Sequence, residues 1–303
     1  MAGLAPRAAV AVPTVLLALA AGVVSGRQPA PPTSSASPSV CAAPSAAPRV
    51  DAAPVMAVAR LTLSRCARQD LDEGRWRDAD RRLGAARAAA VLVPVTHRQA
   101  WRALVVRLEA TRLADAGRWA DLGAVVLPDE EVLPWVGPLL RGVATARASW
   151  AQQDADLQAR ARAELVRLDA LARQAGPLSA EEHARLLVQA AMAGAQYERD
   201  EMQLLLDAAH DLERRLMADD EFRWPVILAR ELEGDLLLTT DRPAAASERY
   251  RDLLVEWPRR VQSRIGLAAA YRRQGFVREA DETLAQARAL WAGADPDAIA
   301  LVR

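Results

Sequence analysis

The sequence contains no lysine and no asparagine, so arginine supplies all 39 of its basic residues. A Walker A phosphate loop needs a lysine, and so does a Schiff base to a carbonyl substrate. N-glycosylation in turn needs an asparagine as its acceptor. These absences exclude P-loop nucleotide hydrolysis, imine catalysis through lysine and N-linked glycans.

An excess of charge of one sign is also missing. The 39 basic residues are balanced by 39 acidic ones, and neither kind forms a long run. A protein that binds nucleic acid normally carries a basic patch that neutralises phosphates. We therefore expect no nucleic-acid partner.

Aromatic residues make up only 4% of the sequence, so the core must be built mainly from alanine, leucine and valine. Alanine and leucine are among the best helix formers, and runs of β-branched residues are scarce. A single core stops growing at about 250 to 300 residues, whereas a stack of repeats avoids this limit because each unit packs only on its neighbours. The composition predicts an all-α protein and is compatible with a repeat architecture.

A pattern near the C-terminus repeats with a period of 34 residues. The positions of the first copy, each followed by its equivalent in the second, are Gly234 and Ala268, Leu237 and Tyr271, Ala246 and Ala280, Tyr250 and Leu284, and Leu253 and Ala287. This register resembles the tetratricopeptide repeat (TPR), a pair of antiparallel helices. The resemblance implies a right-handed α-solenoid of antiparallel helical hairpins, which we assign to residues 55–303.

Turns of one design support further hairpins outside the two clear repeats. The four turns are Gly74-Arg75-Trp76, Gly117-Arg118-Trp119, Asp241-Arg242-Pro243 and Gly275-Phe276-Val277. Apolar residues three and four apart predict helices on both sides of each turn. Leu122 replaces the small residue of the second hairpin, which we therefore expect to be splayed.

Helices are also predicted between and within these hairpins. Their expected ranges are 131–149, 154–173, 222–239, 243–257, 261–274 and 277–291, with a further pair after a capping box at Ser179 and Glu182. Trp76 and Trp119 follow equivalent turns, which favours a structural role, whereas one or two of the other six tryptophans could line a groove.

The N-terminus has the layout of an export signal. Arg7 precedes an apolar run over residues 8–24, and Ser25 and Gly26 follow it. Residues 1–26 are thus a predicted signal peptide or membrane anchor, with possible membrane attachment through residues 8–24. Residues 27–54, rich in Pro, Ala and Ser, are a predicted flexible linker. We expect the protein to be exported to the periplasm or cell envelope, or secreted.

The sequence has two cysteines, Cys41 and Cys66. In an oxidising compartment they could form a disulfide that ties the linker to the first helix. The alternative is that Cys66 is a small buried apolar residue and Cys41 a free thiol. The sequence leaves both interpretations open.

No catalytic or metal-binding constellation is evident. His97, His183 and His210 lack metal-ligand spacing, and the sequence has no nucleophile elbow, glycine-rich phosphate loop or C-x-x-C motif. We therefore expect a protein that is not an enzyme and needs no cofactor or metal.

The TPR resemblance places partner-binding residues on the first helices of successive hairpins. The outward-facing residues there include Arg230, Arg264 and Arg272, which would suit an acidic peptide or the carboxyl terminus of a partner protein. The alternative is a solvated charged face.

The leading hypothesis is an exported, non-enzymatic scaffold that binds a partner peptide or helix in a concave helical groove. One alternative is the accessory helical domain of a cell-envelope enzyme, with Glu181, Glu182 and His183 as candidate catalytic residues. Another is a membrane-anchored assembly factor.

Overall fold

The computed structural model describes residues 41, 53–219 and 225–302. The predicted export signal (1–26) and all of the predicted linker (27–54) except residues 41, 53 and 54 therefore lie outside the described residues. Within the described ranges there are thirteen α-helices, two short 3-10 helices and no strand. The prediction of an all-α protein is confirmed for this part of the protein.

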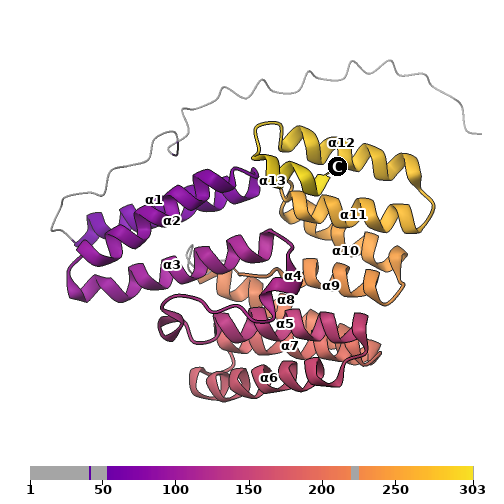
Figure 1. Ribbon diagram of the computed structural model, residues 1–303, viewed down its shortest axis with the longest axis horizontal. Helices are drawn as coiled ribbons and strands as arrows, with labels where there is room; N and C mark the ends of the chain where they lie inside the picture. The colour runs from indigo at the N-terminus through magenta and orange to yellow at the C-terminus, as the bar shows by residue number, and fades with distance from the viewer. Residues whose placement is uncertain (1–40, 42–52, 220–224, 303) are drawn as a thin grey trace, which may run out of the picture. The chain divides into compact units, whose positions relative to one another are not determined.

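The α-helices are α1 (Ala53–Asp72), α2 (Trp76–Leu92), α3 (Val95–Asp115), α4 (Trp119–Leu122), α5 (Val136–Gln152), α6 (Ala155–Ala175), α7 (Ala180–Ala195), α8 (Arg199–Asp219), α9 (Ala229–Thr239), α10 (Pro243–Glu256), α11 (Val261–Arg273), α12 (Val277–Leu290) and α13 (Pro296–Ile299). The 3-10 helices are η1 (Glu130–Val132) and η2 (Ala300–Val302). Long helices that follow one another pack side by side (Figure 1). In addition, each odd-numbered helix from α1 to α9 contacts the next odd-numbered one.

The four predicted turns share one backbone geometry. The first residue of each turn has a positive φ angle: 67° at Gly74, 66° at Gly117, 58° at Asp241 and 83° at Gly275. Glycine adopts this left-handed conformation without steric cost, and aspartate tolerates it better than most other residues. In three of the turns the next amide donates to a carbonyl five residues earlier, from Arg75 to Asp70 at 2.8 Å, from Arg242 to Leu237 at 2.8 Å and from Phe276 to Tyr271 at 2.9 Å. The sequence thus located the ends of these helices correctly.

A fifth turn of the same build joins α7 to α8. Tyr197 has a φ angle of 62°, and the amide of Glu198 donates to the carbonyl of Ala193 at 2.9 Å. A bulky residue rarely adopts a positive φ. The ring of Tyr197 lies 4.2 Å from that of Trp150, centroid to centroid, and this contact helps to offset the backbone strain.

Three predicted helices differ from the structure. The helix expected over 131–149 begins at Val136, because Pro134 lacks an amide hydrogen and disfavours helical backbone at the residue before it. The helix expected over 222–239 begins at Ala229, four residues after Pro225. The second helix of the hairpin around Gly117 is a single turn rather than a splayed partner, and its Leu122 lies in the core.

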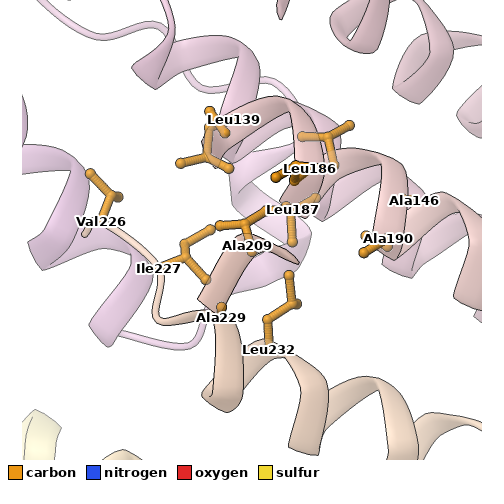
Figure 2. Close-up of a cluster of buried hydrophobic side chains, with 14 of the residues drawn as sticks. Leu139, Ala146, Leu186, Leu187, Ala190, Ala209, Val226, Ile227, Ala229 and Leu232 are labelled. Atoms are coloured by element: carbon orange, nitrogen blue, oxygen red, sulfur yellow. The ribbon is translucent and has the colours of Figure 1, made fainter. Parts of the chain in front are cut away.

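The largest buried cluster draws on helices from the middle of the sequence. Leu139, Leu187 and Ala209 come from α5, α7 and α8, and they share this cluster with Leu232 of α9 (Figure 2). The segment before α9 adds Val226 and Ile227 to the same cluster. Alanine is common at these contacts because its short side chain lets helix backbones approach each other. This agrees with the core of alanine, leucine and valine that the low aromatic content predicted.

One aromatic ring connects α10 to both of its neighbours, α9 and α11. Tyr250 is fully buried, and a Cβ atom added at Gly234 of α9 would lie 2.5 Å from its ring. At Gly266 of α11 the added atom would lie 2.3 Å from the ring. The repeat pattern had identified the small residue at Gly234, but it missed Gly266, which is where the ring approaches α11.

Candidate binding cleft

The C-terminal segment packs against the first hairpin. The backbone amide of Asp295 donates to the carbonyl of Gly74 at 2.9 Å, and the amide of Arg77 donates to Asp295 Oδ2 at 2.6 Å. Ala298 and Val302 are buried in a cluster that contains Trp76. The C-terminal segment is thereby held against the first hairpin, and η2 lies beside α9 and α11.

Two adjoining cavities follow the faces of α9 and α11. The first has a volume of about 540 Å³ and the second about 300 Å³. Both are lined by Asp235, Leu238, Ile265, Ala269 and Leu301. We call the two cavities together the binding cleft. Its shared walls are mostly apolar, and Leu301 of η2 contributes to both parts.

Asp235 organises the polar groups at the centre of the cleft. Its Oδ1 accepts a hydrogen bond from the Tyr250 hydroxyl at 2.5 Å, and its Oδ2 accepts one from Arg147 of α5 at 2.7 Å. Burial, together with the adjacent Asp235 carboxylate, raises the pKa of Tyr250 well above its ordinary value. The guanidinium of Arg147 also lies 4.8 Å from the ring centroid of Trp119. These contacts tie α5, α9 and α10 together around the cleft.

A buried arginine, Arg260, lines the second cavity. Arg260 Nη2 donates to Asp115 Oδ1 at 2.5 Å and to Glu231 Oε2 at 2.7 Å, and Arg260 Nη1 lies 3.5 Å from Asp72 Oδ1. Burial opposes the charged form of Arg260, yet attraction to Asp115 and Glu231 raises its pKa well above the ordinary value. Arg260 therefore stays protonated and links α1, α3 and α9 to the start of α11.

The three arginines predicted to bind a partner have different surroundings. Arg230 pairs with Asp207 at 2.8 Å and Glu233 at 2.6 Å and does not line the cleft. Arg264 also lies outside the cleft lining; its Nε and Nη1 atoms are buried without a hydrogen-bond partner among the described residues, and burial lowers its pKa. Arg272 alone of the three lines the cleft.

The candidate residues for an enzyme also have identifiable contacts. Glu182 forms a two-point pair with Arg185, with both oxygens 2.7 Å from guanidinium nitrogens. His183 Nε2 lies 3.3 Å from Glu213 Oε2, and that oxygen accepts the backbone amide of Ala229 at 2.9 Å. Glu213 thus caps the start of α9, a structural use of this carboxylate. Over residues 53–219 and 225–302, no cluster of three or more His, Cys, Asp or Glu side chains is arranged to hold a metal ion.

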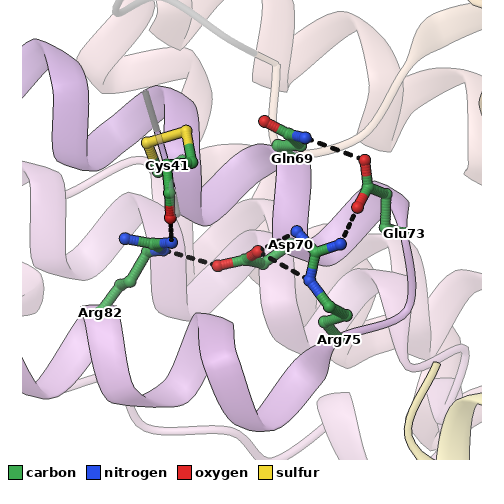
Figure 3. The surroundings of a disulfide bond; sticks show 7 residues. Cys41, Gln69, Asp70, Glu73, Arg75 and Arg82 are labelled. Atoms are coloured by element: carbon green, nitrogen blue, oxygen red, sulfur yellow. Dashed lines mark hydrogen bonds and ion pairs between the residues drawn. A yellow bond between two sulfur atoms is a disulfide. The ribbon is translucent and has the colours of Figure 1, made fainter. Parts of the chain in front are cut away.

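The structure joins Cys41 and Cys66 by a disulfide bond. Arg82 supports the same region, because its Nη2 donates to the Cys41 carbonyl at 2.7 Å and its Nε donates to Asp70 at 2.6 Å (Figure 3). Asp70 is buried and also accepts from Arg75 Nε at 3.1 Å. The bond therefore fixes residue 41 against the first hairpin.

The sequence did not single out the carboxylates that surround Arg260, although it held one signal. Asp72 and Asp115 each end a helix two residues before a turn glycine, Gly74 and Gly117. This recurrence marks equivalent places in two hairpins. That both carboxylates meet Arg260 follows only from the packing of distant helices.

Comparison of the sequence and structure with protein-family models, with curated proteins and with solved structures found no match. Among the described helices, none is long and apolar enough to cross a membrane. The predicted attachment through residues 8–24 lies outside the described residues.

Proposed function

We propose that this protein is a non-enzymatic scaffold, exported to the cell envelope, that holds a segment of a partner protein in the binding cleft. The observation that carries the proposal is the cleft itself, which continues from a cavity of about 540 Å³ into one of about 300 Å³ along two neighbouring helices. Clefts of this size, with mostly apolar walls and a few convergent polar groups, are typical binding sites.

We further propose that the helices form a right-handed, TPR-like α-solenoid. Two observations support this arrangement: the contacts between successive odd-numbered helices, and the recurrence of one turn geometry from Gly74 to Gly275. In such an array the first helices of the hairpins share one face. Here α9 and α11 would supply the part of that face that binds the partner.

The polar contacts of the cleft suit binding. Asp235 has both oxygens occupied by groups of the protein, Tyr250 and Arg147. These bonds fix the shape of the cleft and leave Leu238, Ile265 and Leu301 to contact an apolar side chain. The disulfide between Cys41 and Cys66 supports export, because such bonds persist in oxidising compartments.

Site-directed photocrosslinking tests the proposal. A photoreactive amino acid at Arg272, an exposed residue that lines the cleft, is used in the intact protein in its native cells. The blocking variant is Ala269→Trp, since Ala269 is exposed and lines both cavities. The matched control is Ala285→Trp at an exposed position of α12 that does not line the cleft.

The proposal predicts that one partner segment, identified by mass spectrometry of the crosslinked peptide, is captured by the original protein and by Ala285→Trp. Capture by Ala269→Trp should fall at least about tenfold, because an indole in the cleft excludes the segment. Equal capture by all three proteins, or no defined segment in any of them, would contradict the scaffold.

A further inference from the structure

The second cavity of the cleft has too few hydrogen-bond donors for its acceptors. Asp115 is only 2% exposed, and its Oδ1 accepts from Arg260, but its Oδ2 has no donor among the described residues. Gln262 lines the same cavity, and its Oε1 also lacks a donor there. A buried carboxylate oxygen without a donor is costly, so this cavity favours a ligand that supplies one.

The neighbouring negative charges also favour a cation in this cavity. Asp72 and Asp115 are the last residues of α1 and α3, where the helix dipole already contributes partial negative charge. Glu231 adds a third carboxylate, and Arg260 bonds to all three of these residues. Glu231 has a second donor in the Ser263 hydroxyl, at 2.7 Å. Asp72 is also paired with Arg68, so Asp115 has the least compensation.

The rest of the cavity suits the stem of a long basic side chain. Its apolar wall includes Ile227, Leu232 and Ile265, and the ring of Trp119 also lines it. Arginine and lysine combine an aliphatic stem with a charged end, so each can bury the stem against such a wall. A volume of about 300 Å³ is compatible with one side chain rather than a folded element.

We propose that the cavity at Asp115 receives the guanidinium or ammonium group of a basic side chain on the partner segment. This inference rests on the proposed scaffold function, and it specifies the chemistry of the partner segment. It differs from the acidic partner expected from Arg230, Arg264 and Arg272, because the cavity offers carboxylate and amide oxygens, whereas two of those arginines lie outside the cleft lining. The cation would donate to Asp115 Oδ2 and Gln262 Oε1.

Two probes of equal length isolate the charge. N-acetylarginine amide ends in a charged guanidinium group, whereas N-acetylcitrulline amide ends in a neutral urea group. Binding of each probe to the full-length protein is followed by NMR titration of the tryptophan indole resonances. The arginine probe should bind at least about tenfold more tightly, as a charge-assisted hydrogen bond to a buried carboxylate implies. N-acetyllysine amide, with its ammonium group, should also bind more tightly than the citrulline probe.

Two variants and one control assign the preference to this cavity. Asp115→Asn should reduce the preference for arginine over citrulline to about twofold or less, since the carboxylate is replaced by an isosteric amide. Ala269→Trp keeps every charge but obstructs the cleft, so both probes should lose affinity; it also serves if Asp115→Asn does not fold. Asp252→Asn, an exposed carboxylate on α10 whose partner Arg249 does not line the cleft, should leave both affinities unchanged.

Equal affinity for the arginine and citrulline probes, or an affinity for the arginine probe that Ala269→Trp leaves unchanged, would overturn the inference. A captured partner segment without a basic residue at the crosslinked site would also overturn it while leaving the scaffold standing. Conversely, the arginine probe could bind selectively while photocrosslinking captures no partner segment. That result would reject a protein partner and assign the cavity to a free cationic molecule.

Discussion

Trp291 donates its indole Nε1 hydrogen to the backbone carbonyl of Asp72 at 2.8 Å, across 219 residues of sequence. The Trp291 side chain is only 1% exposed, and its ring meets that of Trp76 edge to face at a centroid distance of 6.1 Å. The helix preceding Trp291 is thereby fastened to the end of α1. This contact holds the C-terminal segment beside the cleft.

Trp291→Ala should destabilise the protein by about 3 to 5 kcal/mol, because it leaves a large cavity beside Trp76 and removes the donor to Asp72. Urea unfolding followed by circular dichroism measures the loss. Phe276→Ala, at an aromatic residue that is 49% exposed, is the control and should change stability by less than about 1 kcal/mol. Similar effects of the two substitutions would show that the contact between α1 and Trp291 contributes little.

Gly234→Ala and Gly84→Ala should change stability in opposite directions. Alanine is the better helix former by about 1 kcal/mol, and at Gly84 the added Cβ meets nothing within 4 Å, so stability should rise. At Gly234 the Cβ would lie 2.5 Å from the buried Tyr250 ring, so stability should fall by about 1 to 3 kcal/mol. Chemical denaturation of both variants tests the pair, and a stabilising Gly234→Ala would contradict the packing of Tyr250.

The buried Tyr250 hydroxyl predicts a loss of stability in alkali. Its pKa is raised in the folded protein, whereas an unfolded protein has a tyrosine pKa of about 10. The resulting stability is present in full below about pH 10 and is lost as the pH rises towards the folded pKa. The advantage of the original protein over Tyr250→Phe should therefore shrink between about pH 9 and pH 11 in urea unfolding. An advantage that stays constant over this range would contradict the burial of a neutral hydroxyl.

Removal of the disulfide should destabilise the protein by about 3 kcal/mol. The bond closes a loop with a sequence separation of 25, and a cross-link of this span restricts the unfolded state. The variant is Cys41→Ser with Cys66→Ala, since Cys66 is buried and alanine adds no polar atom there. Reduction of the original protein should give the same stability as this double variant. Two reactive thiols in the unreduced protein would contradict the bond.

The sequence was sufficient to predict the helices that have local signals. Glycine or aspartate at a positive φ marked four turns, and small residues 34 positions apart indicated close helix contacts. The fifth turn was missed because Tyr197 occupies the left-handed position, where nothing in the sequence predicts a turn. The Tyr197 ring contacts Trp150, 47 residues earlier in the sequence, and no local pattern indicates such a contact.

The candidate site was much harder to predict. Arg230 lies on α9 and Arg264 and Arg272 lie on α11, two helices that the sequence had predicted, but Arg230 is engaged by Asp207 and Glu233. Spacing along one helix indicates which residues share a face. It does not indicate which carboxylate of another helix will meet them.

The sequence by itself determined the helical class, the turn positions and the absence of lysine chemistry, because helix propensity, periodicity and composition are local properties. Only the tertiary structure decided that Arg260 would meet Asp115, 145 residues away, and that η2 would border the cleft. Such contacts join residues far apart in the sequence, so no local pattern indicates them. Long-range packing, not any single motif, therefore gives the cleft its acidic end.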